Sequence, residues 1–225
     1  AEVSMKSADM RSSNLGRAFF ENADLTGAKI TRAVVSACVF RNVRLVAADF
    51  DAMNLTGLNF SGVDLTSASL AEVRCAGADF SSAILERANL RGAVFEDTKF
   101  DAARFAGATL NEAKLINCSL RGAQMPGMNL SETVLDGSNF TAANLEKANL
   151  RKAKLEGCSL AQARLNGANL ESADVSQADL TGAQFAGANL SGMVCVAANF
   201  TGAIFTDAKA PNARFVGARL EFANL

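Results

Sequence analysis

A period of five residues runs through the whole chain and limits the folds that it can adopt. The residue at every multiple of five, here called the central position, is apolar in all 45 repeats from Met5 to Leu225. Two residues earlier lies the small position, which is alanine in 30 of 45 repeats. Its larger exceptions are Met53, Leu58, Met128 and Met193. All 45 Lys, Arg, Asp and Glu residues occupy the other three columns, so the chain repeats one unit.

Neither a helix nor a strand keeps both apolar columns on one side, because their periods are about 3.6 and 2. A coil that turns a corner every five residues does so. Sixteen of the 17 glycines lie two residues after a central position, and Pro126 and Pro211 lie directly after one. Glycine favours positive φ, and proline suits the second position of a β-turn. The sequence therefore predicts straight five-residue sides joined by turns.

The spacing of phenylalanine and asparagine indicates how many sides make one coil. Central phenylalanines recur at intervals of 20 or multiples of 20, at Phe20, Phe40, Phe60, Phe80, Phe100, Phe140 and Phe200. The same interval separates Asn129, Asn149, Asn169 and Asn189. Rings and amides of one kind pair well on neighbouring strands. Residues 20 apart should lie above one another, which favours four sides per coil over three.

The repeated unit resembles the signature of the pentapeptide-repeat family. Eleven copies of Ala-(Asp/Asn)-(Leu/Phe) occur, such as Ala23-Asp24-Leu25, Ala88-Asn89-Leu90 and Ala198-Asn199-Phe200. The resemblance covers the whole chain and implies an all-β fold, the right-handed quadrilateral β-helix. It implies a pentapeptide-repeat solenoid of about 11 coils of 20 residues, with no interrupting loops.

Residues 1–225 are expected to form a single solenoid domain. Val3 is already in register, the chain stops on Leu225, and neither terminal segment is helix-like. A solenoid normally needs its ends covered. We expect a segment of a longer chain whose flanking domains cap the solenoid, or ends covered by end-to-end association or by a partner.

One coil is expected to be wider than the others. Phe95, Phe100 and Phe105 are three consecutive central residues, so their coil holds unusually large side chains. Extra volume in a packed core displaces the backbone.

The five cysteines all lie in inward columns, at Cys38, Cys75, Cys118, Cys158 and Cys195. Cys118 and Cys158 share a column but are two coils apart, about 10 Å, which is beyond disulfide reach. We expect free buried thiols that act as small apolar residues, with no metal site. Such thiols favour a reducing, cytoplasmic compartment.

The composition argues against catalytic activity. The chain has no histidine, which is the commonest general base and metal ligand, and no phosphate-binding glycine loop. Its net charge is −1, which gives no bulk attraction for nucleic acid. No apolar run is long enough to span a bilayer. We expect no enzymatic activity, no cofactor, no direct nucleic-acid binding and no membrane span.

One group of outward residues departs from the polar pattern. Apolar residues recur on the third side of the coil, among them Val194, Val196, Val216, Ile116 and Val134. Two interpretations remain open, because β-branched residues suit strands and because an exposed apolar patch can bind a partner.

The leading functional hypothesis is a rod-like scaffold for protein–protein interaction, with an unidentified protein partner. The alternative comes from the family resemblance, since some bacterial members mimic duplex DNA and bind DNA gyrase, as in quinolone resistance. Mimicry needs acidic residues along one side, whereas acidic and basic residues are mixed here. One outward column, for example, begins Asp9, Lys29, Asp49.

Overall fold

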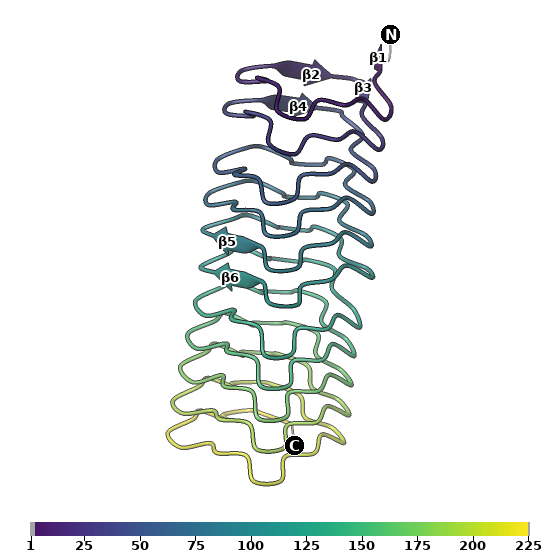
Figure 1. The fold of residues 1–225 in the computed structure, drawn as a ribbon. Coiled ribbons are helices and arrows are strands. Elements are labelled where there is room, and N and C mark those ends of the chain that lie inside the picture. The colour runs from purple at the N-terminus through teal and green to yellow at the C-terminus, as the bar shows by residue number, and fades with distance from the viewer. Residues whose placement is uncertain (1–2, 225) are drawn as a thin grey trace.

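The computed structural model describes residues 3–224 as a tall stack of coils, with the two chain ends at opposite ends of the rod (Figure 1). The residue before each central position pairs in parallel with the residue 20 positions later, from Ser4 with Asp24 to Ile204 with Asn224, except at Val34 with Asn54 and at Thr109 with Asn129. Turns separate the sides every five residues. The predicted coil of four five-residue sides is therefore confirmed, and no loop interrupts it within the described residues.

Six segments are long enough to be strands. They are β1 (Val3–Ser4), β2 (Phe19–Glu21), β3 (Ala23–Asp24), β4 (Val39–Arg41), β5 (Val94–Glu96) and β6 (Lys114–Ile116). β1 pairs with β3, β2 with β4 and β5 with β6, all in parallel. Elsewhere the coils join through single-residue bridges, because each side is short and ends in a turn.

The corners are mostly type II β-turns. The N–H of the small residue donates to the carbonyl of the preceding central residue, as from Ala8 to Met5 at 3.1 Å. The residue before the small one has φ between 50° and 72° in every described repeat, including 28 repeats where it is not glycine. Pro126 and Pro211 precede this left-handed residue, which is where type II turns favour proline. The predicted roles of both residue types are confirmed.

The aspartate or asparagine of the repeat signature holds the turn that follows it. In repeats throughout residues 3–224, its side-chain Oδ1 accepts the backbone N–H two residues later, as from Ser61 to Asn59 at 2.8 Å. This Asx interaction occupies an N–H that the turn leaves free. Where the signature residue is serine, the preceding coil can supply the acceptor. Asp101 accepts the N–H of Arg121, which follows Ser119, at 3.0 Å.

The core is a continuous apolar column inside the rod. Four consecutive pairs from Phe20 to Phe100 stack face to face, with ring centroids 4.9–5.5 Å apart, which confirms the predicted phenylalanine ladder there. The asparagine ladder forms in two of its three steps: Asn149 donates to Asn129, and Asn189 donates to Asn169, each at 3.1 Å. Identical side chains thus link neighbouring coils inside and outside the core.

Candidate functional site

The outer surface offers four sides with balanced charge. The sides are numbered by their central columns, which begin at Met5, Met10, Leu15 and Phe20. Within residues 3–224 and in that order, they carry six, seven, five and four basic residues against five, seven, five and five acidic residues. No side has a continuous acidic stripe, which a mimic of duplex DNA would require.

Ion pairs between coils neutralise many of the acidic residues. Arg104 contacts Glu86 and Arg164 contacts Glu146, each with N–O distances of 2.5 Å, and Lys152 contacts Glu132 at 3.7 Å. Exposed pairs of this kind contribute only about 0–1 kcal/mol each to stability. They place acidic and basic side chains of neighbouring coils side by side.

The apolar residues predicted on the third side fall into two groups. Val196 and Val216 are neighbours in adjacent coils, and Val216 is 61% exposed, whereas Val194 and Val196 are half-buried. Ile116 and Val134 are also half-buried, and they lie earlier along the rod. Charged residues separate the two groups, namely Asp136, Lys154, Glu156 and Asp174.

The ladder between coils is open on the third side near the N-terminus. In the other coils of residues 3–224, the N–H groups at the positions of Arg32, Val35 and Ala37 donate to the following coil, apart from Glu112, but these three do not. The return bond from Asn54 N–H to Ala33 carbonyl is also absent, and Val34 forms no bridge with Asn54. We call this opening between residues 32–37 and 51–56 the slot.

The slot is a hollow of about 1180 Å³ with an apolar floor and a polar mouth. Val35, Met53 and Leu58 line it and are buried, while Val34 is 52% exposed. Its charged lining residues are Asp9, Arg11, Arg32 and Asp51.

Three of these four charged residues already have partners. Arg11 donates to both carboxylate oxygens of Asp9, at 2.9 and 2.6 Å, and this contact lowers the pKa of Asp9 to about 2. Asp51 accepts the N–H of Ala71 at 2.9 Å. Arg32 forms no ion pair within residues 3–224, so it is the unpaired charge at the mouth.

Oversized residues in the small column accompany the slot. Met53 and Leu58 occupy consecutive small positions in the coil below it, where alanine is usual. The bond that the N–H after Met53 should donate, from Asn54 to Ala33, is missing, whereas Val39 still bridges Asn59 after Leu58. Excess volume at these positions therefore explains the separation of the coils.

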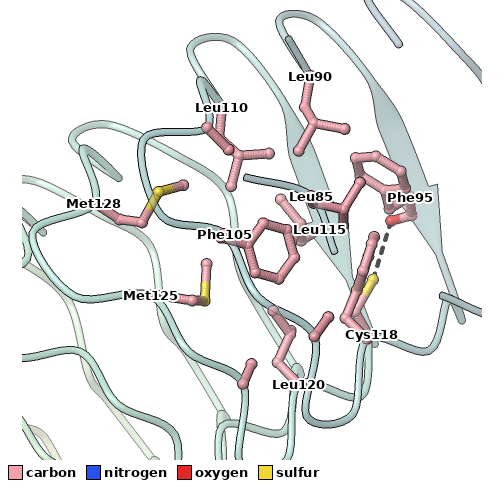
Figure 2. Packing of buried hydrophobic residues seen from close by; sticks show 14 of the residues in the cluster. Leu85, Leu90, Phe95, Phe105, Leu110, Leu115, Cys118, Leu120, Met125 and Met128 are labelled. Atoms are coloured by element: carbon pink, nitrogen blue, oxygen red, sulfur yellow. Dashed lines mark hydrogen bonds between the residues drawn. The ribbon is translucent and has the colours of Figure 1, made fainter. Parts of the chain in front are cut away.

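A second break has the same cause. Met128 occupies a small position, and the bonds from Leu110 to Asn129 and from Asn129 to Ala108 are absent on the second side. Figure 2 shows Met128 and Met125 near Phe105 and Leu110 inside the rod. The widening expected at Phe95, Phe100 and Phe105 is therefore not found at these residues but on the side that follows them. Their coil keeps its bonds to the coil before it, and the break begins at residue 107.

Met193 shows when a large residue is tolerated. It also occupies a small position, yet Val194 donates to Ala173 at 2.9 Å and the ladder is closed. The next central residue is Cys195, and Val175 lies above it. Small central residues leave room for Met193, whereas Met53 and Met128 precede leucines. Sequence reasoning noted the large residues but missed this dependence on neighbours.

The cysteines are buried and unpaired, as predicted. Cys38 and Cys158 donate their S–H groups to carbonyls of the preceding coil, those of Leu15 and Leu135, at 2.8 and 3.1 Å. Burial raises the pKa of Cys118, Cys158 and Cys195 to about 12, and it raises the pKa of Cys38 and Cys75 as well.

These thiols should resist modification in the folded protein. Only the thiolate reacts, and at pH 8 the raised pKa values keep the thiols neutral. We expect Ellman's reagent to label all five cysteines in denaturing guanidinium chloride, whereas in the native protein Cys75, Cys118, Cys158 and Cys195 should not react rapidly. Fast native labelling of any cysteine other than Cys38 would contradict this burial.

In the part of the chain that the structure describes, residues 3–224, no three His, Cys, Asp or Glu side chains are arranged to bind a metal ion. Residues 3–224 also include no helix long and apolar enough to cross a bilayer.

The parallel ladder and the four-sided coil define a right-handed quadrilateral β-helix, a class of solenoid protein. The chain belongs to the pentapeptide-repeat family. The model "Pentapeptide repeats (8 copies)" matches residues 4–42, 36–71, 59–97, 74–111 and 178–221, and "Pentapeptide repeat region" matches residues 108–185. The family predicted from the signature is therefore confirmed.

Similar solved structures are themselves pentapeptide-repeat proteins or resistance proteins. HetL, involved in heterocyst differentiation regulation in the cyanobacterium Nostoc sp. strain PCC 7120, aligns with a TM-score of 0.50 and 26% identity over 99% of this chain and 89% of its own. Full-length QnrB1, a plasmid-mediated fluoroquinolone resistance protein, aligns with a TM-score of 0.39 and 22% identity over 79% and 93%. No curated protein sequence matches significantly.

Proposed function

We propose that the protein is a non-enzymatic, rod-shaped scaffold that binds other proteins along its sides. The observation that carries this proposal is the surface itself: within residues 3–224, four sides of parallel ladder with only two breaks, each carrying both acidic and basic residues. A rigid array of this kind presents many side chains at fixed spacing, which suits docking rather than catalysis.

The valines of the third side are the proposed contact for a partner. Val196 and Val216 lie next to each other with no charged residue between them in their column. An apolar group bordered by polar residues is typical of a protein interface. Arg214 lies beside this pair, below Val194, and supplies a polar rim.

The experiment is affinity capture with matched variants. We expect wild-type protein to retain partners that the Val196→Ser, Val216→Ser double variant loses. Ile204→Ser is the control, because Ile204 is 38% exposed on the first side of the same region. Identical capture by all three proteins would exclude the valines, and capture by none would contradict the scaffold role.

Mimicry of duplex DNA is the weaker alternative. Each side combines acidic with basic residues in similar numbers, so it lacks the uniform negative charge of a phosphate backbone. A gyrase supercoiling assay separates the two functions. The scaffold proposal predicts no inhibition, whereas inhibition at stoichiometric protein would favour mimicry.

A further inference from the structure

We propose that the slot on the third side binds an extended peptide segment of a partner protein by strand addition. The inference rests on the proposed protein-binding function but concerns a different surface from the valines. It names the partner's chemistry: a main chain in β conformation, small or apolar inward side chains, and a carboxylate near its N-terminal end.

The unpaired main chain is the first argument. At the slot, three N–H groups of the upper coil have no acceptor, those of Arg32, Val35 and Ala37. Their usual acceptors in the lower coil, the carbonyls of Asp51, Asn54 and Thr56, have no donor. The return bond, from the Asn54 N–H to the Ala33 carbonyl, is also absent. None of these eight groups has another hydrogen-bond partner within residues 3–224.

These groups form two facing strand edges. A free edge is a template for another strand, and an added strand supplies donors and acceptors in alternation. A segment parallel to both coils would accept from Val35 and Ala37 and donate to the carbonyls of Asn54 and Thr56. Full insertion requires the coils to stand two strand spacings apart, about 10 Å.

The lining of the slot selects the inward side chains. Its floor is formed by Val35, Met53 and Leu58, all apolar. Alternate residues of an extended peptide would point toward this floor, since side chains alternate along a strand. The hollow of about 1180 Å³ holds a short segment, because ligand sites are commonly about 300–1,000 Å³.

Charge fixes the direction of the peptide. Arg32 is the unpaired cation, and it stands where the chain enters the third side. In a parallel strand, the N-terminal residue of the peptide lies beside Arg32. A carboxylate at that residue can form the bidentate contact that guanidinium groups favour.

The probe is the acetylated, amidated peptide Glu-Ala-Thr-Val-Thr with a fluorescent label. It places Glu beside Arg32 and points Ala and Val toward the floor. We expect saturable binding, measured by fluorescence anisotropy, and at least tenfold weaker binding when the Ala and Val amides are N-methylated. Methylation removes main-chain donors but keeps the side chains, so equal binding would overturn strand addition.

Protein variants locate the binding. Arg32→Glu should weaken this peptide at least tenfold and favour the peptide with Lys in place of Glu, without disturbing the core. The Met53→Ala, Leu58→Ala double variant should close the slot and lose binding, while Met193→Ala, in a closed ladder, should retain it.

Hydrogen exchange shows whether the slot exists and responds. In the free protein, the amides of Val35 and Ala37 should exchange faster than those of Leu55 and Gly57, which are bonded one coil later. The peptide should protect Val35 and Ala37. No binding, or binding unaffected by Arg32→Glu, would overturn the inference and leave the valine experiment untouched.

Discussion

Replacing Phe100 by alanine should destabilise the protein by about 3–5 kcal/mol, the usual cost of deleting a buried ring. Phe100 is fully buried and stacks on Phe80 with centroids 5.2 Å apart. It also contacts Phe95 and Phe105, at 5.0 and 5.4 Å. The cavity cannot collapse easily, because the ladders on both adjoining sides fix the backbone.

Urea denaturation followed by circular dichroism measures this loss. Phe222→Ala is the matched control, since Phe222 is 91% exposed and its truncation should change stability by no more than about 0.5 kcal/mol. Equal midpoints for the two variants would show that the stacked rings do not support the core.

Replacing Ala168 by methionine should open a third break in the ladder and cost about 1–3 kcal/mol through overpacking. Ala168 occupies a small position before Leu170, the same context in which Met128 accompanies a break. The bonds at risk run from Asn169 to Ala148 at 2.9 Å and from Leu150 to Asn169 at 2.7 Å.

Hydrogen exchange at Leu150 and Asn169 detects this opening directly. Lys154→Met introduces the same side chain at an exposed outward position and should leave both amides protected. If Ala168→Met kept its protection and stability, the volume of the small residue could not explain the slot or the second break.

Most of the fold could be predicted from the sequence because the repeat fixes it many times over. Every central residue is apolar and nearly every small one is compact, so only one register buries both columns. The phenylalanine spacing predicted the 20-residue coil, because residues 20 apart must lie directly above one another for the rings from Phe20 to Phe100 to stack.

The breaks could not be predicted because they depend on fit between coils rather than on residue type. Met53, Met128 and Met193 are the same residue in the same column, yet only the first two accompany an open ladder. Met193 is followed by the small central residue Cys195, which leaves room for the methionine side chain. The residue types of one column do not show this, because the free volume depends on the neighbouring column. The outward role of Asp101, which bonds the next coil, likewise depends on a neighbour 20 residues away.

The two breaks also affect how the rod unfolds. In a solenoid each coil is stabilised by its immediate neighbours, so cooperativity passes along the rod from one coil to the next. Missing bonds at the slot and near Met128 weaken that coupling at two levels. We therefore expect the rod to unfold as three cooperative units, with the first two coils opening at the slot before the remainder unfolds.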